Sequence, residues 1–164
     1  MTSLRPVTAA DTPLLREIFA ATRADELALT GWNDVQKAGF IRMQFDMQTA
    51  HYDAHFPAAN RSVVEVDGEP AGRFYVERNA DGIQVIDISL LPAFRGRGIG
   101  TGLLRALLEE ADRHRLPVGI YVEQNNPAQR LYERLGFAER GTEGIYRQLV
   151  RAPQVRPAAC TIGD

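Results

Sequence analysis

The chain has little of what marks several large classes of protein. Its 164 residues include one cysteine, Cys160, so no internal disulfide can form and a reducing cytosol is expected. No apolar run approaches the roughly 20 residues that a membrane span needs, and the first six residues lack the apolar stretch of a signal peptide. A net charge of −2 lacks the positive excess of a nucleic-acid binder. These absences favour a globular protein of the cytoplasm.

What is present fits one domain. Hydrophobic residues make up 45% of the chain and charged residues 24%, which is ordinary for a chain that buries a single core. From Arg151 onward proline and alanine dominate, with little to bury. We therefore expect a domain over residues 1–150 and a flexible tail over 151–164. Cys160 lies in that tail, where nothing nearby activates its thiol, so it is no candidate nucleophile.

Hydrophobic periodicity and turn residues predict a mixture of strands and helices. Helix starts are expected at Asp11 and Asn33, and Asp67-Gly68 marks a hairpin turn. The expected strands cover residues 4–8, 61–66, 71–78, 83–91 and 118–123, with a final strand pair over 137–150; helices are also expected over 101–115 and 127–135.

The most informative segment is Arg95-Gly96-Arg97-Gly98-Ile99-Gly100, where a β-branched strand gives way to a helix. Glycines there let the backbone approach a ligand closely. The unpaired N–H groups of a helix N-terminus favour an anion, and two arginines add positive charge. The segment predicts a cradle for a pyrophosphate.

Two common phosphate loops are excluded by spacing. A P-loop ends in Gly-Lys-Ser/Thr, but Gly100 is followed by Thr101 without a lysine. The dinucleotide fingerprint needs a glycine three positions after its second one. That position holds Thr101 if counted from Gly98 and Leu103 if counted from Gly100. The pattern that fits is Arg-x-x-Gly-x-Gly, which begins at Arg95.

A second motif follows the next expected strand. Residues 122–137 read Val-Glu-Gln-Asn-Asn-Pro-Ala-Gln-Arg-Leu-Tyr-Glu-Arg-Leu-Gly-Phe. Together the two motifs resemble the GNAT superfamily of acyl-CoA-dependent N-acyltransferases. That family pairs Arg/Gln-x-x-Gly-x-Gly/Ala with a later Asn-x-x-Ala-x-x-Leu/Phe-Tyr-x-x-x-Gly-Phe. The match runs from about Ile83 to Phe137 and is most similar to small bacterial-type members of unassigned substrate.

The resemblance implies a layered α+β fold, the GNAT fold. Its sheet is mixed but mostly antiparallel, with about seven strands and about four helices. The implied element order is β-α-α-β-β-β-α-β-α-β-β, and the fourth and fifth strands are expected to splay apart. The resemblance also implies acetyl-CoA (coenzyme A) as the cofactor, inserted at that splay.

The family motifs also indicate which residues hold the cofactor. Backbone groups of Leu90 and Leu91 are expected to pair with the pantetheine arm, and the Leu91 N–H to donate to the thioester carbonyl. Asn125 matches the family asparagine that contacts this arm, whereas Asn126, before Pro127, has the signature of a helix cap. The full expected set is Leu90, Leu91, Arg95, Gly96, Arg97, Gly98, Ile99, Gly100, Thr101, Asn125 and Tyr132.

For catalysis, the resemblance points first to Tyr132, at the family position that usually protonates the coenzyme A sulfur. A tyrosine there can also be simple packing. For the general base, Asp87 and Glu123 are both candidates, because each interrupts an apolar strand. Such a carboxylate is either functional or paired with a nearby arginine, and family members often use ordered water instead. The expected catalytic set is Tyr132, Asp87, Glu123 and the Leu91 backbone.

The acceptor pocket of this fold is shaped by the second helix and the loop before it. The candidates there are Asp25, Glu26, Trp32, Met43, Met47 and Tyr52. Adjacent carboxylates attract an ammonium group and Trp32 adds a cation–π wall, although a solvated helix end explains the carboxylates equally well. His51 and His55 have a spacing that a metal uses, but no third ligand accompanies them, so no metal is expected.

Together these features predict an N-acetyltransferase. It would move acetyl from acetyl-CoA to a primary amine of a small molecule or peptide, by direct attack in a ternary complex. No nucleic acid or membrane partner is expected, and a homodimer stays open. Two alternatives remain: a non-catalytic acyl-CoA-binding sensor, and an acyltransferase with another acyl group or acceptor.

Overall fold

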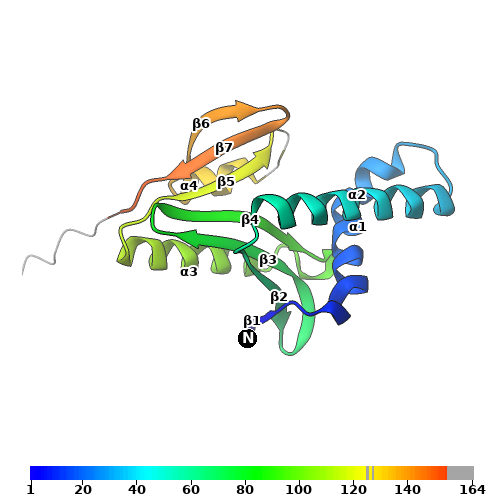
Figure 1. The fold of residues 1–164 in the computed structure, drawn as a ribbon, viewed down its shortest axis with the longest axis horizontal. Coiled ribbons are helices and arrows are strands. Elements are labelled where there is room, and N and C mark those ends of the chain that lie inside the picture. The colour runs from blue at the N-terminus through cyan, green and yellow to red at the C-terminus, as the bar shows by residue number, and fades with distance from the viewer. Residues whose placement is uncertain (125, 127, 155–164) are drawn as a thin grey trace, which may run out of the picture. The chain divides into compact units, whose positions relative to one another are not determined.

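The computed structural model describes residues 1–124, 126 and 128–154. Within them it contains seven strands, four α-helices and two short 3-10 helices, in the element order expected (Figure 1). The predicted mixed α+β fold with a seven-stranded sheet is confirmed. The elements are β1 (Thr2–Pro6), η1 (Ala9–Asp11), α1 (Thr12–Ala28), α2 (Asp34–His55), β2 (Asn60–Val66), β3 (Glu69–Asn79), β4 (Gly82–Leu90), η2 (Pro92–Phe94), α3 (Ile99–Arg113), β5 (Val118–Glu123), α4 (Gln129–Arg134), β6 (Ala138–Glu143) and β7 (Tyr146–Arg151).

The strands form one sheet in the order β1-β2-β3-β4-β5-β7-β6. Strands β4 and β5 pair in parallel, with Ile83–Val85 opposite Val118–Ile120. A parallel pair needs a crossover connection, and α3 supplies it. The neighbouring pairs β1–β2, β2–β3, β5–β7 and β6–β7 are antiparallel.

The chain divides into two compact units. The first comprises Met1–Glu77 and Asp87–Gly100, and so holds α1, α2 and the end of β4. The second comprises Arg78–Ile86 and the chain from Thr101 onward.

In the first unit, α1 and α2 pack through an apolar cluster. Leu15, Ile18 and Phe19 recur at helical spacing on α1 and are buried against Ile41 and Phe45 of α2. The rings of Phe19 and Phe45 lie 6.0 Å apart. This cluster fixes the two helices that carry the expected acceptor residues.

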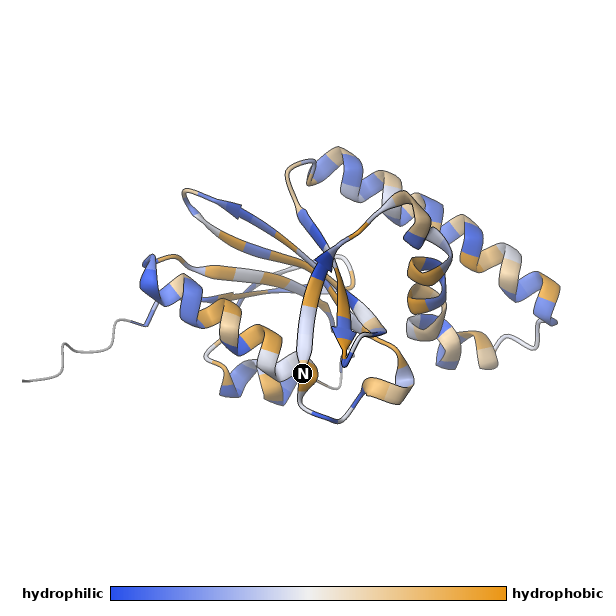
Figure 2. Ribbon diagram, turned by 90° about the horizontal axis from the view of Figure 1, so that it is seen from below, coloured by the Kyte–Doolittle hydropathy of each residue, from blue (hydrophilic) through white to orange (hydrophobic). Residues whose placement is uncertain are grey.

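The remaining surface of α2 is polar or exposed. Hydrophobic and hydrophilic residues follow one another along this helix (Figure 2), and Met43 and Met47 are 50% and 65% exposed. Asn33 caps the helix, because its side chain accepts from the Gln36 N–H at 2.9 Å. The helix start predicted at Asn33 is therefore present.

The first helix begins differently from the prediction. Asp11 precedes α1 but makes no side-chain cap bond to it. Its carboxylate instead accepts from the Thr8 N–H at 2.7 Å and pairs with Arg5 at 2.8 Å. The hydrogen bond from Arg5 is the main reason that the pKa of Asp11 is lowered.

In the second unit, α3 buries one apolar stripe and β5 alternates between faces. The buried residues of α3 are Leu104, Leu107, Leu108 and Ala111; on β5, alternate residues from Val118 to Val122 are buried. Arg151, expected to begin the tail, is the buried last residue of β7 and pairs with Asp112 of α3 at 2.8 Å. The ordered body described here thus includes Arg151.

Among the described helices, none has both the length and the apolar character required to traverse a bilayer.

Candidate functional site

The glycine-rich segment forms a turn that leads into α3. Gly96 and Gly98 have φ angles of 74° and 77°, in the left-handed region that favours glycine. A Cβ added at either position would meet no other atom within 4 Å, so the loop faces open space. Ile99, Gly100 and Thr101 form the first turn of α3, whose N–H groups lack helical partners. The loop thus presents backbone N–H groups at a helix N-terminus, which is the kind of group that suits an anion.

The two arginines of this loop are placed differently. Arg95 donates from Nε to the Leu90 carbonyl at 2.9 Å and from Nη2 to the Ala21 carbonyl at 3.4 Å. The Arg97 guanidinium lies 5.3 Å from the ring centre of Phe94. Both arginines are exposed, but Arg95 is hydrogen-bonded to the end of β4 and to α1, whereas Arg97 contacts only the Phe94 ring among the contacts described here for the two guanidiniums.

The end of β4 is fixed tightly against β3. The Leu91 N–H donates to the Ala71 carbonyl at 2.8 Å. Next to it, a Cβ added to Gly72 would overlap the Ser89 carbonyl oxygen, so only glycine permits this approach. The expectation for Leu91 changes accordingly, because its N–H already has an acceptor. Since successive N–H groups of a strand point to opposite sides, the Leu90 N–H points away from Ala71.

Asp87 lies at the centre of a buried polar cluster in the first unit. Its carboxylate accepts from Ser89 Oγ at 2.6 Å, from the Tyr52 hydroxyl at 2.9 Å and from Arg73 Nη2 at 2.7 Å. Of the two alternatives stated for this carboxylate, the structure shows the pairing with an arginine. Both side chains of the pair are buried, at 3% exposure for Arg73 and 8% for Asp87.

Arg73 was not singled out by the sequence. Burial is the largest single influence on its pKa and lowers it, but the Asp87 carboxylate together with Tyr75 and Tyr52 more than offsets burial, so the pKa of the guanidinium is raised. Its Nη2 also donates to Gln48 Oε1 at 2.7 Å, and its Nε is buried without a hydrogen-bond partner. The sequence signal that was overlooked is its position as a lone arginine within the apolar run of β3 from Ala71 to Val76.

Tyr132 lies on α4 in the second unit and is buried. Its ring meets Phe137 edge-on, with 5.8 Å between ring centres. Burial raises the pKa of the Tyr132 hydroxyl. The phenol is consequently protonated at neutral pH, as a proton donor must be.

The other motif residues of the second unit lie near the end of β5. Glu123 is the last residue of that strand, half-buried and opposite Tyr146. Asn125 falls outside the described residues. Asn126 accepts from the Ala128 N–H at 2.8 Å, just before α4, and so shapes the start of that helix.

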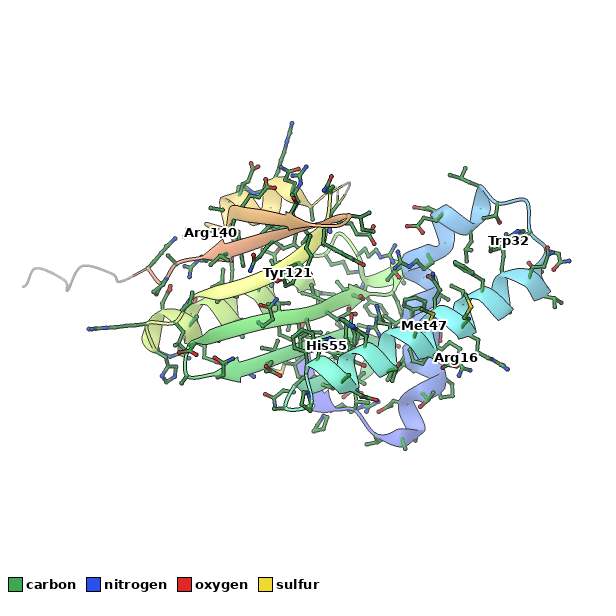
Figure 3. All side chains as sticks on the ribbon, turned by 45° about the horizontal axis from the view of Figure 1, so that its top comes forward. Arg16, Trp32, Met47, His55, Tyr121 and Arg140 are labelled. Carbon is green, nitrogen blue, oxygen red and sulfur yellow. The ribbon has the colours of Figure 1, made fainter. Side chains whose placement is uncertain are left out.

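The six acceptor candidates do not gather in one place. Trp32 precedes α2 and packs edge-on against Phe40 at 5.2 Å, whereas Tyr52 lies near the other end of the helix. Asp34, where α2 begins, and Tyr52 are 18 residues apart, which at 1.5 Å per residue is about 27 Å along the helix. Figure 3 shows Met47 and His55 at different points of this helix and Trp32 in the segment before it. Asp25 is exposed and Glu26 pairs with Arg23 at 3.4 Å. One small-molecule pocket cannot include both ends.

The two histidines on α2 stack on each other. The rings of His51 and His55 are 4.2 Å apart, and His55 Nδ1 lies 3.0 Å from the His51 carbonyl oxygen. Within the described part of the chain, no three His, Cys, Asp or Glu side chains come close enough to hold a metal ion.

Comparison with known proteins adds independent findings. The profile of the "Acetyltransferase (GNAT) family" matches residues 15–137. A Bacillus subtilis (strain 168) protein, provisionally named a ribosomal protein bS18-alanine N-acetyltransferase, is 34% identical over 93 residues, which are 55% of this chain and 61% of that protein. The mycothiol acetyltransferase of Streptomyces avermitilis is 32% identical over 108 residues, 63% of this chain and 35% of that protein. The chain thus spans less than two thirds of either relative.

Solved structures agree on the fold. The PaiA N-acetyltransferase of Thermoplasma acidophilum, crystallised with coenzyme A, superposes with a TM-score of 0.68 over 93% of this chain and 99% of that one. Its sequence identity is 16%, so the similarity is one of fold.

Proposed function

Because this chain belongs to the GNAT acetyltransferase family, we propose that it is an N-acetyltransferase that uses acetyl-CoA to acetylate a primary amine. The observation that carries the proposal is the loop from Arg95 to Gly100, whose two left-handed glycines lead into the N-terminus of α3. Open space in front of the loop and unpaired helix N–H groups suit a pyrophosphate. The residues present therefore fit coenzyme A.

The proposed roles in coenzyme A binding follow from the hydrogen bonds that the groups of the loop and of the end of β4 make within the protein. The backbone around Gly96 and Gly98 and the first turn of α3 hold the pyrophosphate. Arg97 supplies charge for a further phosphate, whereas Arg95 braces the Leu90 carbonyl. Since the Leu91 N–H is engaged by Ala71, the Leu90 N–H is the better donor to the thioester carbonyl.

Acetyl-CoA supplies an activated thioester, and the chain supplies orientation and a proton. We assign the proton donor for the leaving sulfur to Tyr132, whose phenol is protonated at neutral pH, as is any tyrosine of ordinary or raised pKa. The acceptor amine attacks directly in a ternary complex, so no acetylated protein residue is formed.

The acceptor is assigned as a primary amine of a small molecule or peptide. The Bacillus subtilis relative supports an amine acceptor through its name, which refers to N-acetylation of an alanine of a ribosomal protein. Tyr52 and the neighbouring surface of α2 are the acceptor residues that we retain, because Tyr52 belongs to the ordered cluster at the end of β4.

The experiment is a panel of primary amines incubated with acetyl-CoA, with release of coenzyme A followed against an amine-free control. Amine-dependent release supports the proposal. Calorimetric binding of acetyl-CoA without release for any amine would instead favour a sensor, and absence of both would remove the proposal.

A further inference from the structure

The Asp87 carboxylate has donors on both oxygens. Ser89 Oγ donates to Oδ1 at 2.6 Å, and Tyr52 and Arg73 donate to Oδ2 at 2.9 and 2.7 Å. A proton added to this carboxylate would weaken these charge-assisted bonds and leave the buried arginine without its counter-charge. Asp87 is therefore poorly suited to take up a proton during each turnover.

The same ion pair holds α2. Arg73 Nη2 donates to Gln48 Oε1 at 2.7 Å, and Tyr52 donates to Asp87 at 2.9 Å. Gln48 and Tyr52 are four residues apart and so share one face of the helix. Two successive turns of α2 are thus tied to one ion pair that bridges β3 and β4.

The surroundings of the pair are aromatic as well as charged. The rings of Tyr52 and Tyr75 meet edge-on at 6.0 Å, and Arg73 lies 5.3 Å from the ring centre of Tyr75. The titratable and charged groups facing Asp87 are Arg73 and Tyr75 from β3 and Tyr52 from α2, with Arg61 of β2 over Tyr75 and His51 beside Tyr52.

From this geometry we infer that Asp87 and Arg73 are positioning residues that fix Tyr52 and the C-terminal half of α2, and that the amine gives its proton to water instead of to Asp87. The inference rests on the proposed function. On this inference Asp87 is not the general base, although its position in an apolar strand made it a candidate for that role.

The proton balance has a measurable consequence. The acceptor ammonium loses one proton to water before attack. The neutral nitrogen then forms the C–N bond while the C–S bond breaks and its electron pair goes to sulfur; the second nitrogen proton ends on the thiol. The acid limb of kcat/KM therefore follows the pKa of the amine itself.

The test compares alanine amide with Nα-acetyl-lysine amide, whose amines differ in pKa by about two units. The acid limb should lie about two pH units higher for the lysine amine, in the wild type and in Tyr52→Phe alike. Tyr52→Phe should raise KM for the amine several-fold while kcat changes less. The inference would be overturned if the acid limb of kcat/KM lay at the same pH for both amines and disappeared in Asp87→Asn.

A second readout needs no turnover. Hydrogen exchange of the α2 amides from Gln48 to His55 should accelerate at least tenfold in Arg73→Met and in Asp87→Asn, and less in Arg73→Lys, which keeps the charge. If these variants do not fold, Ser89→Ala and Tyr52→Phe carry the test with smaller changes. Unchanged exchange would overturn the positioning role, whereas a wild type without transferase activity would remove the proposed function alone.

Discussion

The guanidinium of Arg95 donates to the Leu90 carbonyl at 2.9 Å, at the end of β4. A second bond reaches the Ala21 carbonyl of α1 at 3.4 Å. Arg97, two residues later, lies over the Phe94 ring instead. Arg95 is therefore bonded to two backbone carbonyls, and we propose that Arg97, which is not, is the arginine that binds a phosphate.

This difference predicts distinct ligand profiles. Arg97→Ala should weaken acetyl-CoA about 10–100-fold if it loses a charge-assisted bond, and dephospho-CoA much less. Arg95→Ala should weaken both ligands equally and should also lower kcat/KM for acetyl-pantetheine, which has no pyrophosphate. Calorimetry and truncated-substrate kinetics measure these effects. An Arg95 variant with normal acetyl-pantetheine kinetics would contradict the bracing role.

Gly98 tests the cradle. Its φ of 77° strains any branched side chain, and a side chain there would fill the space proposed for the pyrophosphate. Gly98→Val should abolish acetyl-CoA binding, and so should Gly98→Asn, which tolerates a left-handed backbone. The control Gly102→Ala, on α3 with no atom within 4 Å, should bind normally. Calorimetry showing full affinity in a folded Gly98 variant would refute the cradle.

Tyr132→Phe tests the proton donor. The ring and its packing on Phe137 remain, so stability and acetyl-CoA affinity should change little. A positioned proton donor contributes about 10²–10⁴-fold, so kcat should fall within that range. The loss should shrink for thioesters of more acidic thiols. Tyr121→Phe, which removes an exposed hydroxyl from β5, is the matched control and should keep wild-type kcat.

The ion pair between Asp112 and Arg151 should make a contribution to stability that is lost in acid. Two guanidinium nitrogens contact the carboxylate at 2.8 and 3.1 Å, and this bonding lowers the pKa of Asp112. A lowered folded pKa adds stability above the unfolded value of about 3.9 and loses it as the pH falls further. Asp112→Asn should therefore cost about 1–3 kcal/mol at neutral pH, with the difference narrowing below about pH 4.

Chemical denaturation across pH measures this effect. Asp46 of α2 supplies a control, because Asp46→Asn removes a carboxylate that is exposed to solvent. If the free energy of unfolding depended on pH in the same way in Asp112→Asn and in the wild type, the role of this ion pair would be contradicted.

Local signals in the sequence predicted the elements well. The bounds of β5 at Val118–Glu123 match the expected strand, because a β-branched run is closed by polar residues. The cap at Asn33 and the left-handed glycines of the loop also follow from residue type alone. The Asp11 side chain went elsewhere because Arg5 and Thr8 compete for it, and that contact depends on tertiary structure.

Local signals did not predict the register between strands or the side-chain pairs between residues far apart in the sequence. Whether the Leu91 N–H faces β3 depends on the phase of the strand pairing, which a one-residue shift would reverse. The partner of Asp87 is 14 residues away on another strand, and Tyr52 is 35 residues away on a helix. Side-chain pairs at such separations have no periodic signature in the sequence.

The central claim is that the chain transfers an acetyl group to an amine. The most direct measurement uses acetyl-CoA with a deuterated acetyl group and follows the label by mass spectrometry in the presence of the amine panel. The account predicts the intact deuterated acetyl group on an amine nitrogen, with an equal amount of coenzyme A released. Label found only in acetate, or retained in acetyl-CoA although the ligand binds, would contradict it.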